Sequence, residues 1–352
     1  MTWDTYDTYD TYDTYDIIVI GAGLTGATIA EQYATKLNKK VLVIDKRDHI
    51  GGNCYDYVDE LGILVNKYGA HLFHTNDEQV WEYVQKFSKW VKWEHKVIGK
   101  IDDKLVPIPV TIDTVNELFN KKITTENEMK EFLDSVQIKY DVITNGEEMA
   151  KSRVGEILYD KIFKDYTFKQ WGKYPDELSA DVLARIPVRC SYDDRYFTDK
   201  YQALPEKGYT VFINNMLTHP NIHVKLNTEF NELDKSLIKD KIVIYTGPID
   251  HYFSCIYEPL EYRSINFVKE NYENLEFYQP NSVVNYPQIR NDEMFTRIVE
   301  YKHFLNQSSP HTTIVKEFTT DKGDPYYPVL NDKNMMLYGK YKEKAEQLVS
   351  QN

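Results

Sequence analysis

Residues 17–45 read IIVIGAGLTGATIAEQYATKLNKKVLVID, and they contain the elements of one complete supersecondary unit. The β-branched run at 17–20 is typical of a short strand that is buried on both faces of a parallel sheet. A glycine-rich turn and a helix-length segment follow, and the second apolar run, at 41–44, predicts another parallel strand. Strand, turn, helix and strand in this order predict an α/β domain of the Rossmann-like type.

The glycine turn has the spacing of a dinucleotide-binding site. Gly21, Gly23 and Gly26 form a GxGxxG pattern. Asp45 ends the second strand and lies 19 residues beyond the last of these glycines. The glycines allow close approach of a pyrophosphate, the helix N-terminus offers N–H groups, and the carboxylate accepts hydrogen bonds from ribose hydroxyls. The alternative is a glycine-rich turn in an unrelated α/β fold.

A second glycine pair, Gly51 and Gly52, follows soon after Asp45. A Rossmann domain that binds only a nicotinamide cofactor does not require a second glycine turn. The pyrophosphate and ribityl chain of FAD extend past the first turn, so this pair favours FAD as the cofactor.

Composition restricts the partners of the chain. Its 352 residues include 42 Lys and Arg against 55 Asp and Glu, and the net charge is −13. A general attraction to nucleic acid or to an anionic membrane is therefore not expected, and a phosphate ligand would need a local basic site. No apolar run reaches the roughly 20 residues that span a bilayer, and the N-terminus does not resemble a signal peptide. The three cysteines are far apart, so we expect a reduced, cytoplasmic protein without disulfides.

The N-terminus carries a repeat. Residues 2–16 consist of one TWD and four TYD units, which hold too little apolar surface to offset the entropy of ordering. We therefore predict a disordered acidic and aromatic tail, with the first domain beginning at about residue 15.

Further elements follow from the pattern of apolar residues. Val154, Ile157, Leu158 and Ile162 keep helical spacing inside a long polar tract. The predicted elements are a hairpin at 95–110, a mostly helical tract at 111–186, a buried strand at 242–245, antiparallel strands within 263–318 and a charged helix at 333–349.

Arginine is scarce and clustered. Only 8 of the 42 basic residues are arginine; four lie between 153 and 195, and three between 263 and 297. Guanidinium groups suit bidentate contact with phosphate, and aromatic rings stack on a planar base. The neighbouring aromatics at 166, 171, 192, 196 and 197 therefore indicate a nucleotide ligand. For any one arginine, the alternative is an ordinary surface ion pair.

The histidines show no metal-binding motif. No HxH, HExxH or Cys/His cluster is evident, so we predict no metal site. His71 and His74 stand three residues apart in GAHLFHT, and from sequence alone each is better interpreted as a buried, hydrogen-bonded histidine than as a catalyst. Because no nucleophile motif is present either, we expect the cofactor to supply the chemistry.

From about residue 15 to residue 340, the chain resembles the bacterial UDP-galactopyranose mutase family. The resemblance rests on the blocks GAGLTG, VLVIDKRDHIGGN, KYGAHLFHT, DYTFKQWG, RIPVR, YDDRYF, GPID, FTRIVEYKHF, VKEF and DPYYP. It implies an α/β fold in which a Rossmann-like FAD-binding domain is joined to an inserted helical domain and an antiparallel β-sheet substrate domain. We expect the tail at 1–14, the FAD-binding domain at 15–90, 197–255 and 325–352, the helical domain at 111–196 and the sheet domain at 91–110 and 256–324.

The resemblance also implies an activity. Family enzymes are isomerases that use reduced FAD, without net redox change, to interconvert UDP-galactopyranose and UDP-galactofuranose for lipopolysaccharide or capsule synthesis. Flavin N5 attacks the anomeric carbon and displaces UDP, and the flavin–sugar adduct opens and recloses as the other ring. A homodimer, an external reductant such as NAD(P)H and a UDP-sugar substrate are implied as partners, with neither nucleic acid nor membrane insertion.

The matching positions imply the site residues. FAD would be held by Gly21, Gly23, Thr25, Gly26, Asp45, Lys46, Gly51, Gly52, Asn53, His71 and Leu72. His74 would lie under the flavin and act with Arg185 and Arg297 in catalysis. The substrate would be bound by His95, Tyr166, Thr167, Trp171, Arg185 (on a mobile loop), Tyr196, Asn285, Arg297, Glu317 and Tyr326.

Two departures from the family pattern stand out. His95 replaces the family's usual asparagine in the substrate pocket, which would change the preferred sugar. Family members also continue beyond PYYP into a GRL…Y…D segment that contacts flavin and substrate. No residues here match that segment before Asn352, so we expect weaker FAD binding and lower turnover.

Two other functions remain open from the sequence. A flavin oxidoreductase of the same fold would explain the glycine turns but not the arginines. An inactive relative that binds a nucleotide sugar would explain both without turnover.

Overall fold

The computed structural model describes residues 14–290 and 293–351. The chain forms two compact units. The first unit comprises Met1–Asp59, Leu64–Lys92 and Ala203–Pro259, and the second comprises Glu60–Ile63, Trp93–Gln202 and Leu260–Asn352. Most of the TYD repeat lies outside the described residues, so the prediction of a disordered tail is not tested there.

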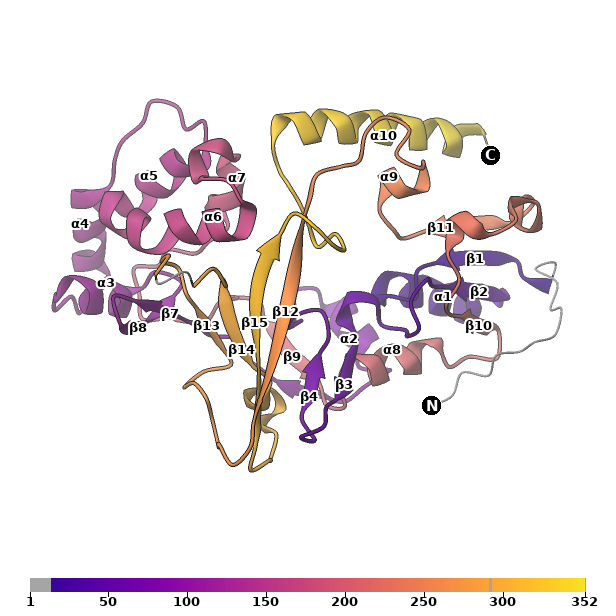
Figure 1. The fold of residues 1–352 in the computed structure, drawn as a ribbon, viewed down its shortest axis with the longest axis horizontal. Helices are drawn as coiled ribbons and strands as arrows, with labels where there is room; N and C mark the ends of the chain where they lie inside the picture. The colour runs from indigo at the N-terminus through magenta and orange to yellow at the C-terminus, as the bar shows by residue number, and fades with distance from the viewer. Residues whose placement is uncertain (1–13, 291–292, 352) are drawn as a thin grey trace. The chain divides into compact units, whose positions relative to one another are not determined.

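A four-stranded parallel sheet forms the centre of the first unit (Figure 1). Its strands follow the order β10 (Ile222–Lys225), β2 (Val41–Ile44), β1 (Ile17–Ile20) and β11 (Ile242–Tyr245). β1 and β2 are buried along their whole length, which explains why both are continuous apolar runs. The predicted strand, turn, helix and strand are confirmed, with α1 (Leu24–Leu37) between the two strands.

β11 corrects the expectation of a fully buried strand. It pairs with β1 alone and so forms an edge of the sheet. Ile242 is 57% exposed, and the other three residues of the strand are half-buried. An apolar run can therefore form an edge strand. Whether a strand lies at the edge depends on the order of the strands in the sheet, and the residues of the run alone do not reveal that order.

The end of the TYD repeat is also more ordered than predicted. Tyr15 is only 6% exposed and packs in a core cluster with Ile18 and Leu42. Its hydroxyl is 2.5 Å from Nδ1 of His223 on β10. The last tyrosine of the repeat thus belongs to the core, because sheet formation brings it an apolar surface and a polar partner together.

Shorter elements complete the first unit. Asp56 is 5% exposed, and its carboxylate accepts hydrogen bonds from the amides of Tyr209 and Thr210 at the start of α8. This carboxylate therefore anchors the N-terminus of that helix. The elements are β3 (Asp56–Val58), β4 (Leu64–Asn66), β5 (Phe73–Thr75), α2 (Glu78–Val84), β6 (Trp90–Lys92), β9 (Tyr201–Pro205), α8 (Tyr209–Leu217) and α9 (Ile249–Tyr252).

The second unit is built on a seven-stranded sheet. All neighbouring strands are antiparallel except β13 and β7, and the hairpin and antiparallel strands predicted from alternation are confirmed. The order is β16 (Tyr327–Pro328), β12 (Tyr262–Tyr272), β15 (Thr312–Thr320), β14 (Arg297–Glu300), β13 (Val283–Asn285), β7 (Val97–Ile101) and β8 (Lys104–Ile108).

The predicted helical tract is confirmed. Val154, Leu158 and Ile162 are buried as expected, but Ile157 is 53% exposed because Gly155, at φ 75°, breaks the regular spacing. The tract contains α3 (Ile112–Phe119), α4 (Glu126–Val136), α5 (Gly146–Leu158), a π-helical turn (Tyr159–Lys164), α6 (Asp165–Trp171) and α7 (Ala180–Ala184).

The final helix, α10 (Asp332–Gln351), lies where the sequence predicts it. Its first turn is tied to Glu261, the residue before β12: the amide of Glu261 donates to the side chain of Asn334, which in turn donates to the carbonyl of Glu261. The second unit includes residues 325–351 together with the helical tract and the seven-stranded sheet. The expected division into an FAD-binding, a helical and a sheet domain stays a prediction. Among the described helices, none has the length and apolar character needed to cross a bilayer.

Candidate functional site

The N-terminus of α1 is suited to an anion. Gly23 is the N-cap residue, so no side chain there caps the helix. The first turn also contains no acidic residue. Its N–H groups are therefore available to a phosphate, which the helix dipole also favours. Thr25 is exposed on this turn.

The two glycine turns lie against each other. The amide of Gly51 donates to the carbonyl of Ala22 at 2.9 Å. A Cβ atom on Gly52 would stand 2.9 Å from the Cα of Gly23, closer than side chains tolerate. One on Gly26 would stand 1.9 Å from the carbonyl oxygen of Gly21, so Gly26 is required by the fold itself. A Cβ atom on Gly23 would meet only ordinary contacts, the nearest at 3.6 Å, so the fold alone does not require glycine there.

Asp45 has the geometry of a ribose acceptor. It is 9% exposed, and its carboxylate accepts hydrogen bonds from the amides of Ala22 at 2.7 Å and Arg47 at 2.9 Å. These bonds orient the carboxylate at the glycine turn and leave each oxygen with lone pairs for hydroxyl donors. Arg47 also donates to the side chain of Asn53 at 3.0 Å, and Lys46 is exposed.

The two histidines of GAHLFHT differ. His71 is half-buried, its Nδ1 lies 2.9 Å from the carbonyl of Gly69, and burial lowers its pKa, so the ring is neutral at physiological pH. His74, on β5, is exposed, which corrects the expectation that it is buried. Leu72 between them is half-buried. The first unit therefore contains all the residues expected to bind FAD, together with His74.

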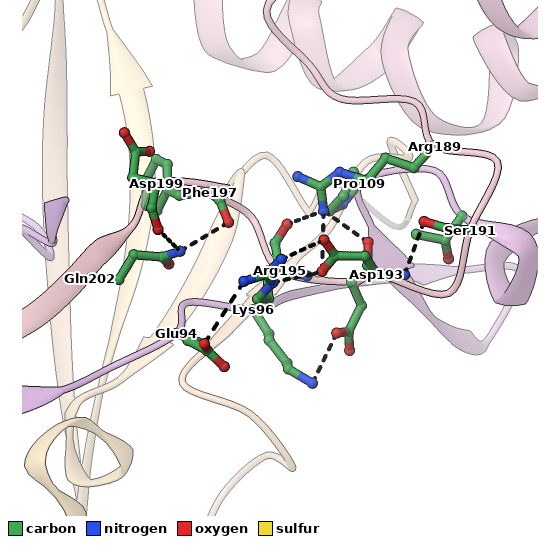
Figure 2. A network of polar contacts seen from close by, with 12 residues as sticks. Glu94, Lys96, Pro109, Arg189, Ser191, Asp193, Arg195, Phe197, Asp199 and Gln202 are labelled. Atoms are coloured by element: carbon green, nitrogen blue, oxygen red, sulfur yellow. Dashed lines mark hydrogen bonds and ion pairs between the residues drawn. The ribbon is translucent and has the colours of Figure 1, made fainter. Parts of the chain in front are cut away.

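In the second unit, most arginines already have structural partners. Arg153 donates to the carbonyls of Leu183 and Ala184 at the end of α7. Arg189 donates to the carbonyls of Asp193 and Arg195, and Arg195 forms a two-pronged pair with Asp193 at 2.8 and 2.9 Å (Figure 2). The RIPVR segment therefore offers one candidate phosphate ligand, Arg185, rather than two.

Two of the three arginines between residues 263 and 297 also have structural partners. Arg263 donates to the carbonyl of Gln170, and Arg290 pairs with Asp102 at 2.7 Å. Arg297 differs, because its partners are side chains that the family resemblance assigns to the substrate site.

Arg297 begins β14 and organises this site. Its Nη2 donates to the hydroxyl of Tyr166 at 2.8 Å, and its Nε lies 3.5 Å from Oε2 of Glu317 on β15. The Arg297 side chain is 30% exposed and that of Glu317 only 6%. Burial raises the pKa of Glu317, and the charge of Arg297 opposes that rise. A half-buried guanidinium thus lies against a carboxylate and a phenol.

Buried polar atoms without partners collect around Arg297. Nε of Arg297, Nδ1 of His95 and Oδ1 of Asn285 are each buried without a hydrogen-bond partner in the described structure. Asn285 pairs with Arg297 across β13 and β14. Burial and the charge of Arg297 lower the pKa of His95 to about 3, so its ring is neutral. Since buried polar groups are normally satisfied, this grouping indicates a polar ligand.

A polar network holds Tyr196 beside His95. Figure 2 shows the loop that runs from Arg189 to Gln202, tied by the arginine contacts above and by an ion pair of 2.9 Å between Lys96 and Asp194. The amide of Tyr196 donates to the carbonyl of His95 at 2.7 Å, and the two rings lie edge to face at 6.0 Å. Arg189 and Arg195 therefore contribute by shaping this loop.

Trp171 connects Arg185 to the site. It is 5% exposed at the end of α6, and the guanidinium of Arg185, which caps α7, lies 5.9 Å from its ring. Thr167 is 4% exposed on the same helix. Tyr327 lies 6.2 Å from Trp171, and the charges of Arg297 and Arg185 reach its hydroxyl, partly offsetting the rise in pKa that burial causes.

Tyr326, which the family resemblance assigns to the substrate, and its neighbour Tyr327 lie in different surroundings. Tyr326 packs on Phe267 at 5.6 Å and lines an open groove of about 640 Å³ with Phe318 and Lys322. Tyr327, and not Tyr326, joins the group around Arg297. Successive side chains of a strand point to opposite faces, and PYYP does not reveal which tyrosine faces the site.

Lys169 is a second residue that sequence reasoning missed. It is 3% exposed, and its Nζ donates to the carbonyls of Tyr286, Gln288 and Phe295 at 2.9, 2.8 and 3.2 Å. Tyr286 and Gln288 lie one and three residues after Asn285, and Phe295 lies two residues before Arg297. Lys169 therefore positions both ends of the segment between Asn285 and Arg297. Its place in KQWG, among buried helix residues, is the only signal in the sequence.

Comparisons with known proteins match both parts of the chain to known families. A sequence model of the UDP-galactopyranose mutase family matches residues 161–351, and one of the NAD(P)-binding Rossmann-like domain matches residues 19–87. A probable UDP-galactopyranose mutase of Klebsiella pneumoniae is 37% identical over 94% of this chain and 85% of its own length. A dTDP-fucopyranose mutase of Escherichia coli is 36% identical over 94% of this chain and 89% of its own length.

The fold is similar to that of a solved structure. The crystal structure of reduced UDP-galactopyranose mutase superposes with a TM-score of 0.68 at 18% identity, covering 89% of this chain and 76% of the other. The predicted α/β fold is thereby confirmed, and the first unit contains a Rossmann-like dinucleotide-binding domain.

Proposed function

Since this chain belongs to the UDP-galactopyranose mutase family, we propose that it is an FAD-dependent enzyme that interconverts UDP-galactopyranose and UDP-galactofuranose, or a close nucleotide-sugar analogue. The family assignment makes the chain an isomerase of the UDP-galactopyranose mutase type. The cofactor, the substrate and the roles of individual residues are the content of the proposal.

The observation that carries the proposal is the set of buried polar atoms without hydrogen bonds around Arg297. A nucleotide sugar offers hydroxyl groups to Nδ1 of His95 and Oδ1 of Asn285, and phosphate oxygens to the exposed part of the Arg297 guanidinium, whose Nε faces Glu317. A neutral His95 can donate to or accept from a sugar hydroxyl without adding charge beside the guanidinium.

In this proposal, the diphosphate is bound by Arg185, Arg297 and Tyr196. Arg297 supplies a guanidinium whose position is set by Tyr166 and Glu317, so little side-chain entropy is lost on binding. Arg185 contributes a second, less constrained guanidinium.

The remaining residues of the candidate site would contact the planar base and the sugar. Trp171 and Tyr166 offer flat faces for the uridine, with Thr167 beside them on α6. His95, Asn285 and Glu317 offer polar groups to the sugar, and Tyr327 takes the role expected of Tyr326.

The first unit fits FAD. The uncapped α1, the close glycine turns and the oriented Asp45 suit a pyrophosphate and a ribose. Gly21, Gly23, Thr25, Gly26, Gly51, Gly52 and Asn53 would surround the pyrophosphate, with Lys46, His71, Leu72 and His74 nearby. When bound and reduced, the flavin supplies the nucleophile for the anomeric carbon. We further propose that NAD(P)H serves as the external reductant and that the enzyme is a homodimer.

The sugar itself is a separate question. The two relatives described above carry the names of different nucleotide-sugar mutases at nearly equal identity. dTDP-fucopyranose is therefore the second candidate substrate, and His95 is the residue most directly placed to discriminate between the sugars.

The test uses the purified protein. The proposal predicts a yellow protein that dithionite bleaches and that then converts UDP-galactofuranose to the pyranose form without consuming oxygen, as followed by anaerobic chromatography. dTDP-fucofuranose is assayed in parallel. Substrate oxidation with oxygen uptake would indicate an oxidoreductase, and binding without turnover an inactive relative; either result contradicts the proposal.

A further inference from the structure

Three side chains of different chemistry converge just after β11 in the first unit. A carboxylate oxygen of Asp250, a ring nitrogen of His251 and the sulfur of Cys255 all lie within 4.8 Å of one another. The proposed roles in flavin and sugar binding do not use these residues. The sequence analysis predicted no metal site, because the spacing DHxxxC of these residues matches no familiar metal-binding motif.

The backbone folds back to form this group. α9 is only four residues long, and the amide of Cys255 donates to the carbonyl of Asp250 at 2.8 Å. Ser254 and Cys255 both adopt left-handed conformations, with φ of 51° and 52°. Two consecutive non-glycine residues in this region are unusual, and such conformations concentrate at ligand-binding sites. The reversal brings the thiol of Cys255 to the carboxylate of Asp250.

The electrostatics favour a cation at this point. Asp250 is 1% exposed, and a carboxylate at that depth requires a polar or cationic partner. A metal ion would supply such a partner and would bind the imidazole and the thiolate at the same time. His251 is exposed and Cys255 half-buried, so an ion can enter from solvent.

We propose that Asp250, His251 and Cys255 form a zinc-binding site with one coordination position left for water. One oxygen, one nitrogen and one sulfur ligand are the donor set that Zn²⁺ accepts in tetrahedral geometry. Thiolate and imidazole exclude Mg²⁺ and Ca²⁺, which require oxygen ligands. The ion would join both ends of the turn from Asp250 to Cys255 and hold it in its left-handed conformation.

The test is site-resolved protection of cysteine from alkylation in the flavin-bound protein. The protein is stripped of metal with a chelator and treated with iodoacetamide, with and without Zn²⁺, and each cysteine is followed by peptide mass spectrometry. Alkylation of Cys255 should slow about tenfold when Zn²⁺ stands at ten times its dissociation constant. Cys190, which is also half-buried, is the internal control and should be unaffected. Excess Mg²⁺ should not protect.

Variants separate a built site from an adventitious one. His251→Ala removes an exposed ligand and should abolish protection of Cys255 while leaving the melting temperature of the metal-free protein unchanged. Zn²⁺ should raise the melting temperature of the wild type and of Cys190→Ser, but not that of Cys255→Ser. Equal alkylation of Cys255 with and without Zn²⁺, or protection that survives His251→Ala, overturns the proposal.

Discussion

Replacing Arg297 by alanine tests the contact that we propose between this residue and the diphosphate. In the proposed complex, the variant loses a charge-assisted contact with the diphosphate. Such a loss costs about 2–5 kcal/mol, which corresponds to a fall of roughly 30- to 4,000-fold in kcat/KM. The Arg297→Lys variant should recover only part of this, because the ammonium group cannot reproduce the bidentate contact.

The same substitution also destabilises the fold, and the structure sets an upper bound. Glu317, 6% exposed, loses the guanidinium 3.5 Å away. An unpaired buried carboxylate can take up a proton instead of staying charged. For an ordinary glutamate pKa of about 4.3, protonation at pH 7 costs about 3.7 kcal/mol. The loss of stability through Glu317 should therefore not exceed that value, and it should shrink as the pH falls.

A double variant tests this reasoning. Arg297→Ala with Glu317→Gln removes the unpaired charge, so it should regain most of the lost stability at pH 7, while its kcat/KM stays as low as that of Arg297→Ala. Urea unfolding at pH 7 and pH 5, with anaerobic kinetics of the reduced enzyme, measures the two quantities separately. Wild-type kcat/KM in Arg297→Ala, or recovery of turnover in the double variant, would refute the assignment of Arg297 to the diphosphate.

The remaining predictions concern the second arginine, the cofactor and acid stability. Arg185→Ala should lower kcat/KM by a similar factor. Its melting temperature should change little, since the described contact of the guanidinium is with the ring of Trp171. A large fall in melting temperature together with the fall in kcat/KM would contradict this prediction. Gly23→Ala should lose flavin, measured as the absorbance ratio after gel filtration, without loss of apoprotein stability, whereas Gly26→Ala should destabilise the apoprotein itself. Asp45→Ala should weaken flavin retention by about 1.5–3 kcal/mol, and full occupancy would assign this residue a purely structural role. Glu300 is fully buried, and although burial alone would raise its pKa, its hydrogen bonds lower the pKa overall. The ionised carboxylate should therefore stabilise the fold above about pH 4.3, the ordinary pKa of glutamate in the unfolded chain. This stabilisation should be lost as the pH falls through the lower pKa of the folded state. Glu300→Gln should melt lower at pH 7 and show less acid dependence, and identical pH profiles would contradict this.

The dinucleotide site could be predicted from sequence because its parts are close in the chain. Strand, glycine turn, helix and acid occupy residues 17–45, and the periodicity of that segment is enough to identify each element. The second glycine pair follows within a few residues. The structure confirms this local order and adds that the fold itself requires Gly26 but does not require Gly23.

The substrate site could be predicted only in outline. Clustered arginines and aromatics indicated a nucleotide, but the clustering alone did not distinguish Arg297 from Arg189. Only the family resemblance assigned Arg297 to the substrate, and in the structure Arg189 supports the loop around Tyr196. The partner of a guanidinium is decided by which carbonyls and carboxylates the fold brings within reach, and those lie on distant segments. Lys169 was missed for the same reason, since its three acceptors lie more than a hundred residues away.

The sequence by itself determined the α/β class, the location of the dinucleotide turn and the family resemblance, because these depend on periodicity and short-range spacing. Only the tertiary structure decided that Tyr327 rather than Tyr326 joins Arg297, that Tyr15 belongs to the core, and that Asp250 meets Cys255. Each of these outcomes depends on the face a side chain takes or on a reversal of the backbone. Such features follow from packing between segments, and no single stretch of sequence specifies them.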